Sequence, residues 1–212
     1  MKGLSFSASK DAAKVGKYAE AVANEPQLTF KVARGMEDVL QVYAVRSIVF
    51  VNDQQCPFAE EFDGNDFAAT HILAFLGEEP VGTLRLRFFA DFVKLERVAV
   101  RKEYRKHQVA VHMIRYAMEF CSRKGYTRLY GHIERRLMRF WRHFGFVERP
   151  DHGQRERLVF SDREYVEAFC DLEAVPQSVG IHSSPYVLNR PEGEWERPGV
   201  LDYSSTREAV NV

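Results

Sequence analysis

The chain has 212 residues, and its 30 basic residues balance its 30 acidic residues to a formal net charge of zero. This balance gives no argument for a general nucleic-acid-binding or membrane-binding protein. With 45% hydrophobic and 13% aromatic residues the chain can bury a core of its own, and no apolar run approaches the length that spans a bilayer.

The first part of the chain predicts a helix, a strand and a second helix. Helical spacing of apolar residues predicts an N-terminal helix over residues 1–26, and alternation predicts a strand over 28–35. Helical spacing returns over 36–52. Residues 53–66 combine turn formers with several acids and predict an irregular connection.

The middle of the chain predicts three strands and a long helix. Two alternating segments, 70–77 and 81–90, predict a hairpin with a short connection, and 92–100 predicts a third strand. From Ala110 onward the apolar residues fall on one helix face, and Gly125 suits the end of that helix.

The last part predicts a short strand over 127–133, a second helix that Gly145 ends, and final strands before residue 173. Beyond them the composition changes to Pro, Gly, Ser and charged residues, which predicts a C-terminal arm or linker over 174–212. The order of elements predicts an α/β (α+β) fold, a mixed sheet with helices on its faces, as one domain over 27–173.

The cysteines and histidines predict neither disulfides nor a metal site. Cys56, Cys121 and Cys170 form no even framework and no paired metal-binding spacing. His132 and His143 lack the spacing of zinc ligands. Because the amino terminus also shows no basic-then-apolar export signal, we expect a cytoplasmic protein without a metal.

Residues 101–110 join a predicted strand to the long helix. A loop of this kind points backbone N–H groups and the positive end of the helix dipole at one place. Between Arg101 and Arg142 there are twelve Lys/Arg residues and only three Asp/Glu residues. We therefore expect an anionic ligand at this loop. The basic residues form no nucleic-acid-reading motif, so no nucleic-acid partner is predicted.

The run from Leu95 to Phe146 resembles the cofactor-binding core of the GNAT superfamily of N-acyltransferases. Such enzymes carry an Arg/Gln-x-x-Gly-x-Gly/Ala loop that wraps the pyrophosphate of acetyl-coenzyme A. Here Arg105 matches the first position and Ala110 the last, while Gln108 replaces the first glycine. The strand LERVAV before the loop and the helix ending FWRHFGF also fall at the family's spacing. The resemblance implies a mostly antiparallel central sheet flanked by helices.

The resemblance implies that the loop holds the pyrophosphate and that the preceding strand adds the pantetheine arm as a further strand. The implied cofactor-binding residues are Val98, Ala99, Val100, Arg105, Lys106, His107, Gln108, Val109 and Ala110. Gln108 still supplies a backbone amide, but a left-handed backbone there would strain it or move the loop outwards. Acetyl-coenzyme A is the leading donor; a longer acyl-coenzyme A or an acyl-carrier protein stays open.

The resemblance also implies direct attack of an amine on the thioester, and an amine protonated at neutral pH must first lose a proton to a general base. Glu96 is the candidate base, since it lies on the strand that resembles the family's central one. Strict alternation would place Glu96 on one face with Val98 and Val100. Alternatively, Glu96 serves only as the ion-pair partner of a neighbouring arginine.

Protonation of the leaving thiolate is assigned in many family members to a Tyr on the last helix. The matching position here is Trp141, whose indole is no usable acid. The role is therefore vacant, or filled by Tyr130, Tyr104 or water, and we take Tyr130 as the candidate. Trp141 is predicted to belong to the core, as aromatic residues at helical spacing usually do.

The acceptor site is sought between residues 45 and 71, which resemble a GNAT subgroup with a V-F-V-x-E-Q-x-C-P pattern followed by D-G-x-D. Arg46, Asp63 and Asp66 are the candidate residues for binding a cationic amine acceptor. The alternative is a turn with solvated acids. The segment also resembles, more faintly, acyl-homoserine-lactone synthases. Cys56 has no histidine tied to it in sequence and is predicted to be inert.

Two functions remain open from the sequence. The first is an acyl-coenzyme A dependent N-acyltransferase that uses Glu96 or a water chain as base. The second is a non-catalytic fold that binds an acyl thioester, because Gln108 and Trp141 both depart from the family pattern. A homodimer is a further hypothesis, in which the C-terminal arm with Trp195 packs on a second subunit. The fold does not select the acceptor.

Overall fold

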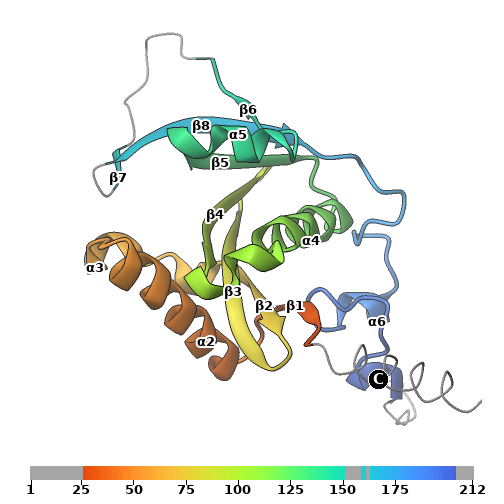
Figure 1. Cartoon of the computed structure of the whole chain (residues 1–212). Helices are drawn as coiled ribbons and strands as arrows, with labels where there is room; N and C mark the ends of the chain where they lie inside the picture. The colour runs from red at the N-terminus through yellow and green to blue at the C-terminus, as the bar shows by residue number, and fades with distance from the viewer. Residues whose placement is uncertain (1–25, 151–158, 161–162, 204–212) are drawn as a thin grey trace, which may run out of the picture.

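A computed structural model describes residues 26–150, 159–160 and 163–203 (Figure 1). Nearly all of the N-terminal helix predicted over 1–26 lies outside these residues. The strands are β1 (Leu28–Val32), β2 (Thr70–Leu76), β3 (Glu79–Phe88), β4 (Val93–Val100), β5 (Arg128–Glu134), β6 (Val147–Glu148), β7 (Val159–Phe160) and β8 (Arg163–Asp171).

The strands form one sheet in the order β1-β2-β3-β4-β5-β8-β6, with β7 paired to β8. Only the β4–β5 pair is parallel among the described strands, and the other pairs are antiparallel. The predicted mixed, mostly antiparallel sheet is therefore confirmed.

Helices cover both faces of this sheet. They are α2 (Met36–Arg46), α3 (Phe58–Glu61), α4 (Val109–Arg123), α5 (Met138–Arg142) and α6 (Pro185–Leu188). A π-helical segment, Ser47–Asp53, continues α2, and short 3-10 turns occupy Asp66–Ala68, Lys102–His107, Arg135–Leu137 and Val200–Tyr203. The connection over 53–66 is thus less irregular than predicted, because it contains α3. None of the described helices is long and apolar enough to cross a membrane.

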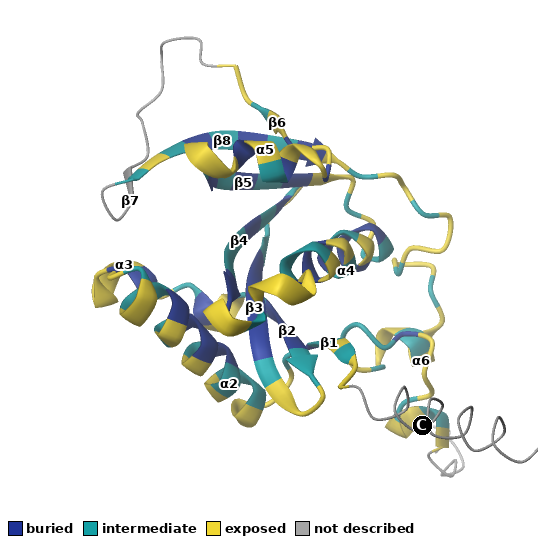
Figure 2. Cartoon of the chain, viewed as in Figure 1, coloured by how far each residue is buried: buried dark blue, intermediate teal, exposed yellow. Residues whose placement is uncertain are grey.

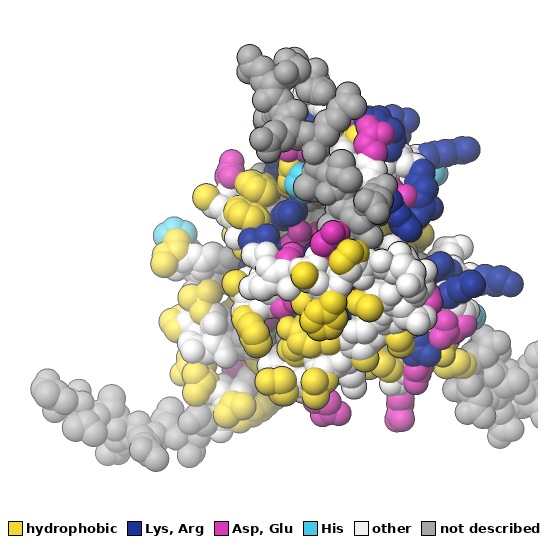
Figure 3. All heavy atoms as spheres, turned by 90° about the vertical axis from the view of Figure 1, so that its left-hand side faces the viewer, with side chains coloured by type: hydrophobic (Ala, Val, Ile, Leu, Met, Phe, Trp, Pro, Cys, Tyr) yellow, Lys and Arg dark blue, Asp and Glu magenta, His cyan; other side chains and the backbone are white. Residues whose placement is uncertain are grey.

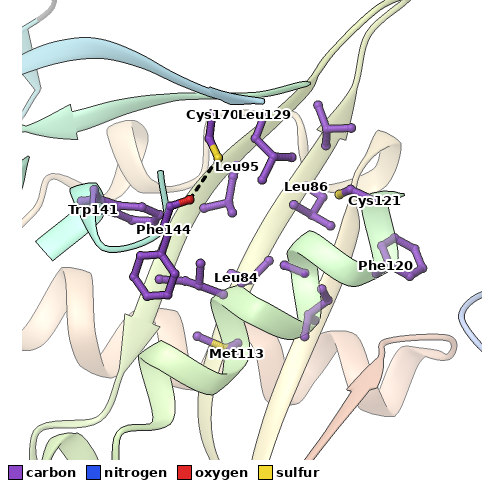
Figure 4. Close-up of a cluster of buried hydrophobic side chains, with 14 of the residues drawn as sticks. Leu84, Leu86, Leu95, Met113, Phe120, Cys121, Leu129, Trp141, Phe144 and Cys170 are labelled. Carbon is purple, nitrogen blue, oxygen red and sulfur yellow. Dashed lines mark hydrogen bonds between the residues drawn. The ribbon is translucent and has the colours of Figure 1, made fainter. Parts of the chain in front are cut away.

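The main hydrophobic core lies between the sheet and helices α4 and α5, while α2 covers the opposite face (Figures 1 and 2). Leu84 of the sheet lies near Met113 of α4 in this core, while Leu95 lies farther along the sheet near Leu129, and Trp141 of α5 lies at one side (Figure 4). Trp141 is 8% exposed, which confirms its prediction as a core residue.

A β-bulge at Arg97 breaks the alternation of β4. Residues Thr83 and Arg85 of β3 pair with Ala99 and Glu96, so β4 carries one residue more than its partner between these pairs. Arg97 absorbs the extra residue with a left-handed φ of 53°. The strict alternation assumed from the sequence is therefore wrong.

The two sides of β4 are exchanged beyond this bulge. Val98 and Val100 pack with the α4 core, whereas Ala99 packs against Val45 and Val49 on the α2 side. Glu96 pairs with Arg85 in the network beneath α2, so it does not share a face with Val98 and Val100.

The C-terminal arm packs on its own domain. Trp195 is 6% exposed and stacks on Phe120 of α4 at 5.4 Å between ring centroids. The guanidinium of Arg123 lies 5.2 Å from the Trp195 ring, and the amide of Val179 donates to the carbonyl of Arg123 at 2.7 Å. The idea that Trp195 packs on a second subunit is corrected by these contacts, while a homodimer itself stays a prediction.

Replacing Trp195 with alanine should release this arm. Trp-to-Ala changes in cores typically cost about 3–5 kcal/mol, but an arm that can detach locally limits the loss to its own docking free energy, about 2 kcal/mol. We expect a lower melting temperature and faster hydrogen exchange of the Val179 amide. Tyr203→Ala, at a side chain that is 77% exposed, is the control. Unchanged exchange at Val179 would contradict the prediction.

The side of the molecule formed by α2 and α3 exposes apolar side chains (Figure 3). Met36 and Leu40 of α2 are 68% and 60% exposed, and Phe58 of α3 is 69% exposed. Phe67 nearby in sequence is 91% exposed. The described residues do not cover this surface.

Candidate active site

Strands β4 and β5 separate soon after they begin to pair. They pair only at Val93 with Leu129 and at Lys94 with Tyr130. At the neck of the opening, a Cβ on Gly131 would lie 3.3 Å from the carbonyl oxygen of Leu95, so glycine allows the strands to approach there. From Leu95 onward the edge of β4 that faces β5 has no strand partner in the described sheet.

A pocket of about 200 Å³ occupies the space between the separated strands. Its walls combine both strands with the π-helical segment, the α5 region and β8. The lining residues are Phe50, Gln54, Lys94, Leu95, Glu96, Arg97, Val98, Gly131, His132, Ile133, Glu134, Arg136, Leu137, Trp141, Phe146 and Tyr165. The pocket therefore brings apolar groups and charges of both signs to one opening in the sheet.

The amino end of α4 carries no side-chain cap. The first N–H groups of a helix lack acceptors within the helix, and the dipole is positive there, so this end favours an anion. Arg105, Lys106 and His107 are exposed in the turn just before it. Arg101, by contrast, is already paired with Glu79 and Glu103. The predicted anion site is thus an exposed, basic helix end.

Gln108 takes the left-handed conformation that the family's glycine would favour. Its φ is 53° and its ψ is 23°, and its side chain is exposed. The left-handed turn that the sequence left open is therefore present without a glycine, and Gln108 bears the strain of it. Arg105 helps to hold the loop, because its Nε donates to the carbonyl of Val100 at 3.1 Å.

Gln108→Gly should stabilise the protein by about 0.5–1 kcal/mol. Glycine removes a left-handed strain of about 1–3 kcal/mol. Part of this stabilisation is lost because glycine also raises the conformational entropy of the unfolded chain. Urea unfolding measures the difference. Gln108→Ala keeps the strain and should leave stability nearly unchanged, and a Gly variant less stable than wild type would refute the strain.

Glu96 lines the pocket and is also tightly paired. Its Oε1 accepts from Nε of Arg85 at 3.0 Å, and its Oε2 lies 2.8 Å from Nζ of Lys94. Arg87 approaches the same carboxylate at 3.9 Å. The ion-pair alternative considered for Glu96 is therefore present, and its role as base stays a prediction.

Behind the pocket lies a buried charge network. Asp66 accepts from Arg46 at 2.5 Å and from Arg85 at 2.8 Å, and both arginines are completely buried. Arg46 also donates to Glu61 at 2.5 Å, and Arg85 forms a two-bond contact with Asp63 at 2.8 and 2.6 Å. The three predicted acceptor-binding residues, Arg46, Asp63 and Asp66, are thus together, but none of them lines the pocket.

Burial and pairing act in opposite directions on these acids. Burial would raise the pKa of Asp63, but hydrogen bonds from Arg85 outweigh it and hold that pKa well below its usual range. The pKa of Asp66 is likewise lowered by Arg46 and Arg85 against its burial. For Glu61, burial prevails over Arg46, and the pKa is raised.

Tyr130 lies beside the pocket and reaches it through a histidine. Its hydroxyl donates to Oε1 of Glu167 at 2.6 Å and lies 3.1 Å from Nε2 of His132. His132 lines the pocket, whereas Tyr130 does not. Any proton transfer by Tyr130 to a group in the pocket would therefore pass through His132.

Sequence reasoning missed several pocket residues. Phe50 and Gln54 reach the pocket because the helix continues in π-helical form beyond Arg46, which no residue pattern indicates. His132 was weighed from the sequence only as a zinc ligand, although it is a titratable residue near the end of the strand next to the predicted central one. Cys56 is buried, in agreement with its predicted inertness.

Comparisons with known proteins indicate a family of acetyltransferases. The family model for the acetyltransferase (GNAT) family matches residues 37–146. The N-acetyltransferase YjcF of Bacillus subtilis, itself uncharacterized, is 28% identical over 137 residues, which make up 65% of this chain and 90% of that protein.

Solved structures agree on the fold. An acyl-CoA N-acyltransferase from Pseudomonas aeruginosa has a TM-score of 0.61 at 20% identity and covers 68% of this chain and 99% of its own. A GNAT family acetyltransferase from Elizabethkingia anophelis with acetyl-CoA bound has a TM-score of 0.53 at 11% identity and covers 68% and 98%.

The fold and these relatives define an acyltransferase. The chain belongs to the acetyltransferase (GNAT) family. The fainter resemblance to acyl-homoserine-lactone synthases gains no support from the comparisons. Among the described residues, no group of three or more His, Cys, Asp or Glu side chains is placed to hold a metal ion.

Proposed function

We propose that the chain is an N-acyltransferase that moves an acyl group, first of all acetyl, from acyl-coenzyme A to a small-molecule amine. The observation that carries this proposal is the unpaired edge of β4, which leads from the pocket to the uncapped, basic amino end of α4. An edge of this kind can pair with an extended amide-bearing arm, and a helix end of this kind binds phosphate.

The residues fit such a donor in two places. The backbone of Val98, Ala99 and Val100 would hydrogen-bond the pantetheine arm. The amides of Gln108, Val109 and Ala110 would hold the pyrophosphate, assisted by the exposed side chains of Arg105, Lys106 and His107. Both places lie on rigid elements, β4 and α4, whose apolar sides belong to the main core.

The acceptor amine would enter the pocket from the side of β8 and the π-helical segment, where Tyr165 and Gln54 lie. Arg46, Asp63 and Asp66 would act on the acceptor indirectly. They fix Arg85, and Arg85 holds Glu96 at the pocket wall. Glu96 is the carboxylate candidate for the general base.

Calorimetry with acetyl-coenzyme A, a long-chain acyl-coenzyme A and coenzyme A tests the donor, followed by release of the free thiol with a panel of primary amines. Tight binding of acetyl-coenzyme A and amine-dependent thiol release are expected. Binding without release for any amine would favour the non-catalytic alternative. Failure of all three ligands to bind would move the donor to an acyl-carrier protein or the chain out of catalysis.

A further inference from the structure

The pocket holds one histidine whose second ring nitrogen is unused. His132 of β5 lines the pocket, and its Nδ1 is buried without a hydrogen-bond partner among the described residues. Buried polar atoms are nearly always paired, so an unpaired nitrogen beside a ligand pocket indicates a partner that the ligand supplies.

The neighbours of His132 decide which nitrogen carries the proton. The hydroxyl of Tyr130 uses its one proton to donate a hydrogen bond to the carboxylate of Glu167, at 2.6 Å. Its 3.1 Å contact with Nε2 of His132 is then a hydrogen bond only if Nε2–H donates to the Tyr130 oxygen. Nδ1 is therefore the unprotonated nitrogen, and its lone pair has no hydrogen-bond partner among the described residues.

The other titratable groups of the pocket are less suited to accept a proton. Glu96 is paired with Arg85 and Lys94. Glu134 is paired with Arg136 and Arg163. Burial raises the pKa of Tyr165, so its hydroxyl stays protonated at neutral pH.

We infer that His132, rather than Glu96, is the catalytic proton carrier of this pocket, a role that rests on the proposed N-acyl transfer. As the neutral amine attacks the thioester carbon, the C–N bond forms and the nitrogen becomes cationic. Nδ1 takes one proton from that nitrogen. The C–S bond then breaks with its electron pair on sulfur, and the imidazolium returns the proton to the thiolate. The products are the amide and the free thiol, and His132 is regenerated.

The surroundings of His132 keep its ring neutral, and so able to accept a proton, and favour the later return of that proton. Burial lowers its pKa, and the ammonium of Lys94 on β4 lowers it further, while Glu96 and Glu167 raise it. On balance the pKa of His132 is lowered, so the ring is neutral at pH 7 and its imidazolium form gives up a proton readily. Glu167 on β8, acting through Tyr130, steadies the cation while it exists, in the way a carboxylate orients a catalytic histidine. This assignment also fills the acid role that Trp141 cannot perform.

The first test does not depend on turnover. Nitrogen-15 NMR of the histidine rings, assigned by loss of the signal in His132→Gln, should show an Nε2-protonated ring with a pKa below the ordinary value for histidine. Tyr130→Phe should weaken the preference for that tautomer. An Nδ1-protonated ring, or a ring already charged at pH 7, would overturn the inference.

The second test measures thiol release with acetyl-coenzyme A and the amine panel. His132→Gln should lower kcat by about 10²–10³-fold while the KM for acetyl-coenzyme A changes little. His143→Gln is the matched control, because His143 is exposed, does not line the pocket, and its Nδ1 lies 2.9 Å from the carbonyl of Arg139. Activity of His132→Gln within threefold of wild type would refute the role of His132 and leave the proposed function standing. Absence of thiol release by wild type with every amine sinks the proposed function as well.

Discussion

Arg85→Met is expected to lower the free energy of unfolding by about 3–5 kcal/mol, the usual cost of removing one partner from a buried ion pair. Arg85 is completely buried and contacts the carboxylates of Asp63, Asp66 and Glu96. Methionine fills a similar volume but leaves these acids with fewer cations in a site that water reaches poorly. Urea unfolding at pH 7 measures the loss.

The deficit should shrink in acid. In wild type the pKa values of Asp63 and Asp66 are lowered by their arginines, so these groups add stability above their unfolded pKa and lose it as pH falls through the folded pKa. In the variant the same carboxylates can protonate more readily. The stability difference between the two proteins is therefore largest near neutral pH and smaller below about pH 4, the ordinary range for Asp.

Two further variants keep this prediction testable if Arg85→Met fails to fold. Arg85→Lys retains the charge but not the fork of donors, so an intermediate loss is expected. Arg87→Met, two residues along the same strand, removes an arginine that is 26% exposed and 3.9 Å from Glu96. It should cost under about 1 kcal/mol, as surface pairs do. Equal losses for Arg87→Met and Arg85→Met would refute the buried network as their cause.

The sequence predicts the elements of this fold well, because most of them carry a clear period. The apolar residues of α4 repeat at helical spacing, and Gly125 and Gly145 end their helices with φ values of +84° and +86°. The order of the elements then limits the possible sheets. What the pattern could not indicate is where two paired strands separate, since β4 and β5 read as ordinary strands on either side of the opening.

The buried charge network is the second feature that the hydrophobic pattern of the sequence does not predict. In the run LRLRFF, Arg85 and Arg87 alternate with leucines, a pattern that is typical of a strand with one face in solvent. Arg85 is instead buried, because α2 covers that face and the 3-10 turn Asp66–Ala68 brings Asp66 to it. Long-range pairing of this kind leaves no local trace. The bulge at Arg97 is similar, since no residue preference predicts a left-handed arginine, and the partners of its side chain, Glu61 and Asp63, lie far away in the sequence.

A negative charge at position 108 tests whether the amino end of α4 binds phosphate. Such a charge should stabilise the helix end, but it should weaken the binding of a pyrophosphate there. Gln108→Glu adds one carboxylate with almost no change in shape to an exposed side chain. A negative charge at a helix amino end is worth about 0.3–1 kcal/mol of added stability. The same charge would repel a pyrophosphate bound to the same amides by about 1–4 kcal/mol per pair of charges at 4 Å.

We therefore expect Gln108→Glu to unfold at an equal or higher temperature while binding acetyl-coenzyme A about tenfold to a hundredfold more weakly by calorimetry, with the difference reduced at high salt. Gln55→Glu is the matched control, since Gln55 is also exposed and left-handed, with φ of 56°, and does not line the pocket. Unchanged affinity in Gln108→Glu would place the phosphates away from α4. Weaker binding of acetyl-coenzyme A by Gln108→Glu, with unchanged binding by Gln55→Glu, would locate the phosphates at the amino end of α4. The same carboxylate would then lower the affinity for the ligand without lowering the stability of the fold.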